Sequence, residues 1–276
     1  MNDYPIVEAI RSILPVVDEM IVLVGDSEDN TIQLMESIGD PKIKIHHSVW
    51  DMQLRKGGEV LAVETNKAFQ LIDPESDWAF YIQGDEVIHE KYLETIRNAM
   101  LKWKDHPEVD GLLFNYLHFY GSYDYFGSSS KWYPHEIRVI RKNENIYSYR
   151  DAQGFRKDDN QKLRVKPVDA CVYHYGWVKD PLAMQRKQES FHKLWHPDTW
   201  LDKNVLKASE FDYAGIDALE LFGGTHPKVM LDRIEQKNWK FDYDVTFNNL
   251  SLKDHFKLFL AKYLGIELGY ANYIKI

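Results

Sequence analysis

The chain has 276 residues, which is long enough to bury a full core and excludes a mini-protein held together by disulfides. Lys and Arg number 34 against 43 Asp and Glu, and the net charge of −9 argues against a protein that binds nucleic acid by neutralising phosphates. The single cysteine, Cys171, excludes an internal disulfide and a cysteine-rich zinc module. With no early apolar run long enough for a signal or a membrane span, these features predict a cytoplasmic protein that does not bind nucleic acid.

Short apolar runs alternate with amphipathic segments along the first part of the chain. This alternation is typical of a layered α/β domain with a mainly parallel sheet, in which ligands lie beyond the carboxyl ends of the strands. In chain order we expect a helix over residues 4–15, a strand over 20–24, a helix over 31–38, a strand over 42–46, a helix over 60–71, a strand over 78–82, a helix over 90–103 and a strand over 111–116.

The second part of the chain begins with a stretch rich in Gly, Ser, Tyr and Phe. We interpret residues 118–132 as a long aromatic loop and expect strands over 136–141 and 168–173. Beyond residue 180 the pattern turns helical, with helices expected over 184–195, 200–208 and 250–264. This change divides the chain into a sheet domain over 1–180 and a helical extension over 181–276.

Acidic residues follow two of the predicted strands. Asp85 comes after the strand over 78–82, and a carboxylate at the ligand edge of a sheet can hold a hard divalent cation. Asp26, Ser27 and Asp29 follow the strand over 20–24 and could contact a ribose or a base. For Asp85 the alternative is a helix N-cap or a solvated turn, which is the more common role of a carboxylate after a strand. For the turn after residue 24 the alternative is a helix-capping turn, and that role is compatible with ligand binding.

Two further residues could complete a reaction centre. His174 follows the strand over 168–173 and could give a nitrogen ligand to the same cation, although a lone histidine also serves structural roles. Asp151 is a candidate general base, and a surface turn is the alternative. Cys171 reads as a small buried residue, because no base or oxyanion device accompanies it.

The order of these signals resembles the family-two glycosyltransferases of the GT-A fold. The turn from Asp26 to Thr31 resembles the acidic turn of that family. Gly58, Ala62 and Asn66 resemble the Gly, Ala and Asn of the helix that follows, and Gln83-Gly84-Asp85 stands where the family has its metal-binding Asp-any-Asp motif, with Gln83 in place of the first acid. Segments such as residues 81–86, 117–122 and 173–177 are similar to those of a bacterial subgroup.

The resemblance implies a three-layer GT-A sandwich and an inverting transfer from a uridine or guanosine diphosphate sugar, with Mg²⁺ or Mn²⁺ on the diphosphate. Under this hypothesis Asp85 and His174 hold the ion and Asp151 is the base. The nucleotide site comprises Asp26, Ser27, Asp29, Gly58, Asn66, Gln83 and Gly84, and the acceptor platform comprises His118, Tyr120, Tyr123, Tyr125 and Trp132. The acceptor would be a glycan or a lipid-linked hydroxyl compound, as in the synthesis of cell-surface polysaccharide.

The family's first strand has no counterpart in the sequence, so we expect an imperfect sheet or reduced donor affinity. Two other functions stay open. One is a degenerate scaffold that binds nucleotide or glycan without turnover, and the other is a sugar nucleotidyltransferase, although no Gly-rich basic phosphate loop is visible near the N-terminus. The helix over 250–264 could pack on the sheet domain, which we expect, or mediate self-association, or lie on the inner face of the plasma membrane beside a lipid-linked acceptor.

Overall fold

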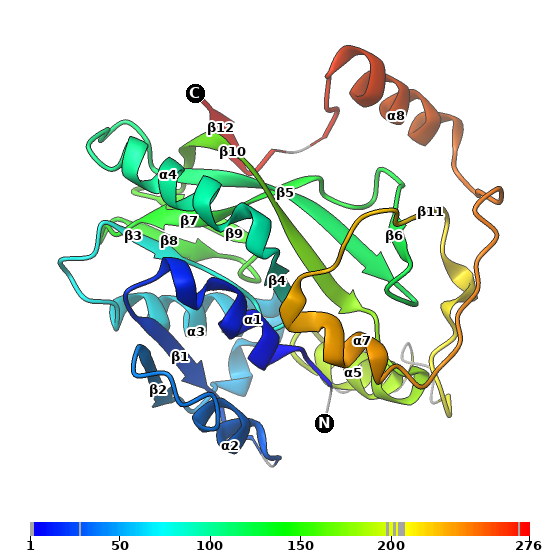
Figure 1. Ribbon diagram of the computed structural model, residues 1–276, viewed down its shortest axis with the longest axis horizontal. Helices are drawn as coiled ribbons and strands as arrows, with labels where there is room; N and C mark the ends of the chain where they lie inside the picture. The colour runs from blue at the N-terminus through cyan, green and yellow to red at the C-terminus, as the bar shows by residue number, and fades with distance from the viewer. Residues whose placement is uncertain (1–2, 28, 197–198, 201–202, 204–207, 270) are drawn as a thin grey trace.

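The computed structural model describes residues 3–27, 29–196, 199–200, 203, 208–269 and 271–276. The chain forms an α/β fold in which helices lie against a large curled sheet (Figure 1). Short 3-10 turns connect several elements. The helices and strands are α1 (Ile6–Ile13), β1 (Met20–Val24), α2 (Thr31–Glu36), β2 (Ile43–His47), α3 (Glu59–Gln70), β3 (Trp78–Phe80), β4 (Glu86–Ile88), α4 (Leu93–Trp103), β5 (Gly111–Tyr120), β6 (Tyr125–Gly127), β7 (His135–Arg141), β8 (Ile146–Tyr149), β9 (Gly154–Lys157), β10 (Gln161–Trp177), α5 (Pro181–Lys193), β11 (Leu219–Leu221), α7 (Leu231–Glu235), α8 (Leu252–Leu264) and β12 (Tyr273–Lys275).

The main sheet has ten strands and is mixed. Its two longest strands, β5 and β10, pair in parallel, and β12 pairs in parallel with β10. All the other strand pairs recorded in this sheet are antiparallel, from β3 with β7 to β8 with β9. The prediction of a mainly parallel sheet is therefore not confirmed. Short connections such as those between β5 and β6 and between β8 and β9 are the reason, because only antiparallel neighbours can be joined by so few residues.

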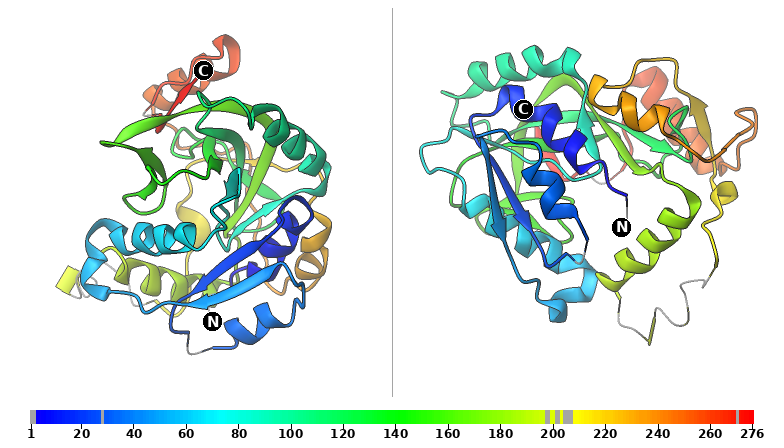
Figure 2. Two further views of the ribbon diagram at one scale, coloured as in Figure 1. Left: turned by 90° about the vertical axis from the view of Figure 1, so that its left-hand side faces the viewer. Right: turned by 60° about the horizontal axis from the view of Figure 1, so that its bottom comes forward.

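β1 and β2 form a second, two-stranded parallel sheet that lies apart from the main one (Figure 2). The strand β1 is apolar at every position, as expected for a strand covered on both faces. It packs with α1 and α2 in a cluster that includes Ile10, Val22 and Met35. Each sheet thus has its own apolar contacts.

One apolar cluster joins α1 and α4 to a face of the main sheet. Ile13 from α1 and Ile96 from α4 are fully buried there against Leu112 and Phe114 of β5 and Val172 of β10. The periodicity that predicted these two helices is therefore the periodicity of their buried faces. The packing of α1 places its first turn near the turn that follows β3, because a Cβ at Gly84 would lie 3.9 Å from the side chain of Ile6.

The expected aromatic loop over residues 118–132 is wrong in its first part. β5 continues to Tyr120, and β6 then pairs antiparallel with it. His118, Phe119 and Tyr120 are buried, and a strand satisfies their backbone groups where a loop would not.

The C-terminal part is only in part helical. Besides α5, α7 and α8 it contributes β11 to the edge at β6 and β12 to β10. α8 projects from the body of the molecule, and none of its side chains is buried, so the close packing that we expected is absent (Figure 1). Most of the helix predicted over 200–208 lies outside the described residues. In the part of the chain that the structure describes, no helix is both long and apolar enough to cross a bilayer.

Candidate functional site

The turn over residues 83–85 lies between β3 and β4 and is held in place by the buried ion pair of Arg138 and Glu86. Arg138 of β7 donates from Nε to Glu86 Oε2 at 2.8 Å and from Nη2 to Glu86 Oε1 at 2.6 Å. The Tyr116 hydroxyl donates to Oε1, and the Gln83 backbone N–H donates to Oε2. Four donors thus occupy the Glu86 carboxylate, so its role is to hold the turn that carries Asp85, and it is not available to a ligand.

Asp85 is buried and lies close to two basic side chains. Its Oδ2 lies 3.3 Å from Lys187 Nζ of α5 and 3.7 Å from His174 Nε2 of β10. Lys187 Nζ also donates to the Gly176 carbonyl at 2.7 Å. A Cβ at Gly176 would come within 2.8 Å of Asp85 Oδ2 and 2.7 Å of His174 Nε2, so only glycine allows this approach.

The tautomer of His174 follows from a chain of hydrogen bonds. His118 Nε2 lies 2.9 Å from the Tyr133 carbonyl, which can only accept, so His118 carries its proton on Nε2. In the neutral ring His118 Nδ1 is then an acceptor, and it receives the proton of His174 Nδ1 at 3.2 Å. His174 Nε2 is left with a lone pair that faces the Asp85 carboxylate. A lone pair and a carboxylate oxygen in this position repel each other unless a cation or a proton lies between them.

The pKa values agree with this assignment. Burial lowers the pKa of His118 to about 3 and also lowers the pKa of His174, so both rings are neutral near pH 7. Burial raises the pKa of Asp85, but attraction from Lys187, His174 and Lys179 outweighs burial and holds that pKa well below its usual range. Burial also lowers the pKa of Lys179 to about 7. The site therefore presents one carboxylate and one neutral imidazole, with Lys187 as the nearest ammonium.

The donor atoms of Asp85 and His174 fit a divalent cation. Two ligands at about 2.1 Å from one ion are at most about 4.2 Å apart, and the observed 3.7 Å lies within that limit. Outer-shell partners such as His118 are the usual means of orienting a ligating imidazole. No three His, Cys, Asp or Glu side chains come together as a complete cage in the described residues. An ion here would take its remaining ligands from water or from a bound phosphate, as Mg²⁺ commonly does.

A cavity of about 1360 Å³ adjoins Asp85. Its wall includes Gln83, Gly84 and Asp85 at one end and Asp151 from the turn between β8 and β9. Burial raises the pKa of Asp151, which makes this acid a better proton acceptor than an exposed aspartate. A Cβ at Gly58 would lie 2.9 Å from Asp151 Cβ, so the start of α3 approaches that acid closely. The structure thus places Asp85 and Asp151 on one cavity.

Other residues predicted for the nucleotide site have local partners. Asp29 accepts from Ser27 Oγ at 2.6 Å, from Thr31 N at 3.0 Å and from the Thr31 hydroxyl, and these bonds lower its pKa. It therefore supports the start of α2, as in the capping alternative. Asp26 is exposed, and none of Asp26, Ser27 and Asp29 lines the cavity. Glu28 of the same turn lies outside the described residues.

Asn66 and Gln83 are also engaged within the protein. Asn66 Oδ1 accepts from the Ser148 N–H at 2.6 Å, and its Nδ2 donates to the Ser148 carbonyl at 3.3 Å, so this amide joins α3 to β8. Gln83 Nε2 donates to the Tyr81 hydroxyl at 3.2 Å, and Gln83 lines the cavity. Gly84 lines it as well, and a Cβ at this position would lie 3.9 Å from the side chain of Ile6.

The aromatic residues predicted for the acceptor do not form one exposed platform. Tyr120 and Tyr123 are buried in two separate clusters. Tyr125 packs edge-on against Phe241. Trp132 is half-buried and stacks on His118 with 5.1 Å between ring centroids, so it contacts the ring that orients His174. His118 itself orients His174 and is shielded from an acceptor.

Sequence reasoning missed several residues of this site. Lys187 and Lys179 contribute its positive charge, and Tyr4 lies under both ammonium groups, with Lys179 Nζ 4.3 Å from its ring centroid. Lys187 comes from a helix that we assigned to the extension. His118 and His174 lie opposite each other on the paired strands β5 and β10. These two histidines were a signal in the sequence that could have led to the site.

No protein-family model matches the chain, and no curated protein matches it.

Proposed function

We propose that this protein binds a nucleoside diphosphate sugar together with a divalent cation, Mg²⁺ or Mn²⁺, and transfers the sugar to a hydroxyl acceptor. The observation that carries this proposal is that the Asp85 carboxylate, on the wall of the large cavity, faces His174 Nε2 at 3.7 Å. More specifically, we propose that the fold is a GT-A-like sandwich, that the donor is a uridine or guanosine diphosphate sugar, and that the acceptor is a glycan or a lipid-linked hydroxyl compound.

The chemistry assigns a role to each residue at the cavity. A bound cation would supply positive charge for the diphosphate as it leaves. Asp85 and His174 hold that ion, and Lys187 adds a further positive charge beside it. The acceptor oxygen forms a bond to the anomeric carbon while the bond from that carbon to the diphosphate oxygen breaks. Asp151 takes the proton of the acceptor hydroxyl, and attack from the face opposite the leaving group inverts the configuration.

Calorimetric titration of UDP and GDP, with and without Mn²⁺, tests the proposal. We expect binding that requires Mn²⁺ in the wild type and a loss of affinity of at least tenfold in Asp85→Asn, because the carboxylate is one of two protein ligands. Asp105→Asn, an exposed aspartate beyond α4, is the charge-matched control and should bind as the wild type does. The proposal would be overturned if the nucleotide affinity changed neither with Mn²⁺ nor with Asp85→Asn, in protein shown to be folded by circular dichroism.

Lys187 favours a second candidate function, a nucleotide-binding scaffold without turnover. Its ammonium already lies 3.3 Å from Asp85 Oδ2 and can neutralise that carboxylate without a metal. Hydrolysis of a donor sugar nucleotide separates the two candidates. Slow release of free sugar that requires Mn²⁺ supports the transferase, and tight nucleotide binding with no release in the presence of Mn²⁺ supports the scaffold.

A further inference from the structure

The helix α8 stands away from the rest of the molecule, and its ends are set by local signals. Ser251 caps its first turn in a capping box with Asp254, and Gly265 ends it in the left-handed conformation, with a φ of 64°. None of its side chains is buried, and extended chain leads up to it (Figure 1). A helix of 13 residues is marginal by itself in water, so a surface that covered one side of it would add to its stability.

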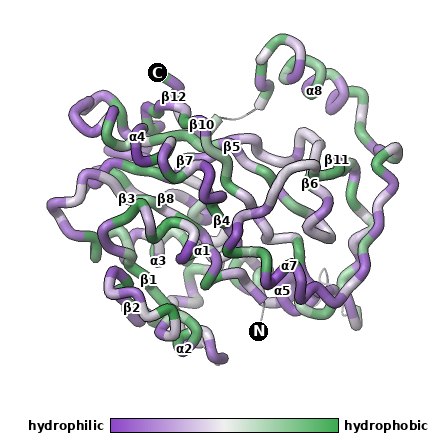
Figure 3. Tube along the Cα trace, viewed as in Figure 1, coloured by the Kyte–Doolittle hydropathy of each residue, from purple (hydrophilic) through white to green (hydrophobic). Residues whose placement is uncertain are grey.

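Large apolar side chains occupy the outer side of this helix. Figure 3 shows hydrophobic and hydrophilic residues interspersed along α8. Four of the hydrophobic ones follow the spacing of one helix side and are each more than half exposed, namely Leu252, Phe256, Phe259 and Tyr263. We call these four side chains the α8 face. Because they adjoin one another, with the rings of Phe259 and Tyr263 5.0 Å apart, they differ from the single apolar residues scattered over most protein surfaces.

The opposite side of α8 is turned to the protein. Asp254 accepts a hydrogen bond from Ser130 Oγ, in the loop between β6 and β7. Leu258 and Ala261, which share that side of the helix with Asp254, are half-buried. The helix is therefore held by one side, and the α8 face points away from the protein.

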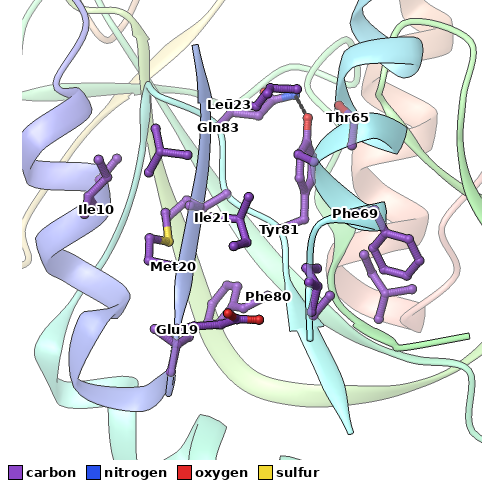
Figure 4. Close-up of a pocket in the computed structure, with 18 of the residues that line it drawn as sticks. Ile10, Glu19, Met20, Ile21, Leu23, Thr65, Phe69, Phe80, Tyr81 and Gln83 are labelled. Atoms are coloured by element: carbon purple, nitrogen blue, oxygen red, sulfur yellow. Dashed lines mark hydrogen bonds between the residues drawn. The ribbon is translucent and has the colours of Figure 1, made fainter. Parts of the chain in front are cut away.

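The other large apolar surface of the molecule lies inside it. Figure 4 shows Met20, Ile21 and Leu23 of β1 at the large cavity, with Phe80 and Tyr81 across from them. A partner reaches those side chains only through the cavity, whereas the α8 face meets solvent directly. Of these two apolar surfaces, the α8 face is the one that a flat, extended partner can cover.

Positive charge borders the α8 face. Lys253 and Lys262 are exposed and stand on its two flanks, and Lys257 adds a third ammonium group to the helix. The only acid between residues 245 and 266 is Asp254, and its carboxylate bonds to the body of the protein. The outer side of α8 is therefore basic and apolar, although the net charge of the whole chain is −9.

These features match an anionic lipid surface more closely than a second copy of the chain. Helices that lie on membranes combine Phe and Leu on one side with lysines beside them, because the apolar groups enter the headgroup boundary while the ammonium groups stay with the phosphates. A stable protein interface buries about 800 Å² on each partner, and one side of a helix about 20 Å long offers less. Two paired copies of α8 would also bring their lysine flanks together with no exposed acid of the helix between them.

We propose that α8 is a membrane-surface helix, which lies on a bilayer containing anionic lipid with the α8 face in the headgroup region and its flanking lysines on lipid phosphates. The helix lies on the bilayer and does not cross it, since 13 residues are too few for a span. The proposal does not rest on the proposed function. Binding to lipid needs neither nucleotide nor cation, so either proposal can fail without the other.

Co-sedimentation of the full chain with lipid vesicles, without nucleotide or metal, tests the proposal. Vesicles of phosphatidylcholine with about 30% phosphatidylglycerol are compared with phosphatidylcholine alone at about 0.1 M salt. We expect at least tenfold higher affinity for the anionic vesicles, and weaker binding at higher salt, which screens the lysines. Phe256→Ser with Phe259→Ser should lose at least tenfold in that affinity, because apolar area drives insertion. Lys253→Gln with Lys262→Gln should reduce binding to the anionic vesicles and leave binding to phosphatidylcholine unchanged.

The matched control is Leu101→Ser with Leu231→Ser, which removes two exposed leucines from α4 and α7 and should bind as the wild type does. Wild-type protein that sediments equally with both kinds of vesicle would overturn the proposal. Unchanged binding in Phe256→Ser with Phe259→Ser, in protein shown to be folded by circular dichroism, would do the same. A dimer that forms without vesicles and dissociates in this double variant would overturn it in favour of a contact between two copies.

Discussion

Buried charges decide what the turn after β3 can bind. Glu86 and Asp85 are adjacent acids, yet their environments differ completely. Glu86 faces Arg138 and is fully occupied, whereas Asp85 faces His174 and Lys187 beside a cavity. The sequence predicted that Asp85 and His174 act together, because each follows an apolar strand. It did not separate the two acids, since only the pairing of β3 with β7 places Arg138 under Glu86.

Glu136 makes the free energy of unfolding depend on pH, which the sequence did not indicate. Burial raises the pKa of this carboxyl from its usual value near 4.5 to about 7. Between these two pH values the folded protein keeps a proton that the unfolded chain releases, so this residue's contribution to stability falls as pH rises from about 4.5 to about 7. We expect Glu136→Gln to raise the free energy of unfolding at pH 8 by about 1–3 kcal/mol and to change it little at pH 4.5.

Urea unfolding of both proteins at pH 4.5, 6 and 8 measures this difference. Asn272 lies beside Glu136 with both polar side-chain atoms buried and without a hydrogen-bond partner in the described structure, so a glutamine amide has a neighbour to bond. Glu144→Gln, an exposed glutamate on the turn before β8, is the control and should show no such trend. A difference between Glu136→Gln and wild type that is the same at all three pH values would contradict the assignment.

Among the elements, strands that are apolar throughout were the most predictable. β1 has the predicted bounds, because five consecutive apolar residues end at a polar turn. β5 was predicted too short, since Tyr, His and Phe at its end resemble a loop in composition but are buried by β6 and by residues from the C-terminal part. The short strands β11 and β12 carry no local signal, and only their pairing with β6 and β10 makes them strands.

The contact between α3 and β8 depends on Asn66. Its amide bonds both backbone groups of Ser148, so its loss leaves two half-buried groups without partners. We expect Asn66→Ala to lower the free energy of unfolding by about 1–3 kcal/mol and to leave nucleotide affinity within about twofold. Asn98→Ala, an exposed position in α4, is the control and should not destabilise. A large loss of nucleotide affinity with unchanged stability in Asn66→Ala would instead indicate that this residue belongs to the nucleotide site.

At the scale of the whole molecule, the two sheets differ in how they are held. β5 and β10 are paired on both sides and covered by α1 and α4, whereas β1 and β2 form a two-stranded sheet whose strand β1 borders the large cavity. A two-stranded sheet has little stability of its own, so its persistence depends on the cluster with α1 and α2. Local openings with free energies below that of global unfolding are expected of such units.

We therefore expect native-state hydrogen exchange to show residues 20–47 opening at a free energy at least about 2 kcal/mol below that of residues 111–120 and 161–177. Mass spectrometry of peptic fragments at increasing urea concentration measures both. Because α1 packs on both sheets, through Ile10 on one side and Ile13 on the other, opening of the small sheet need not expose the main core. Equal opening free energies in all three segments would mean that α1 couples the two sheets into one cooperative unit.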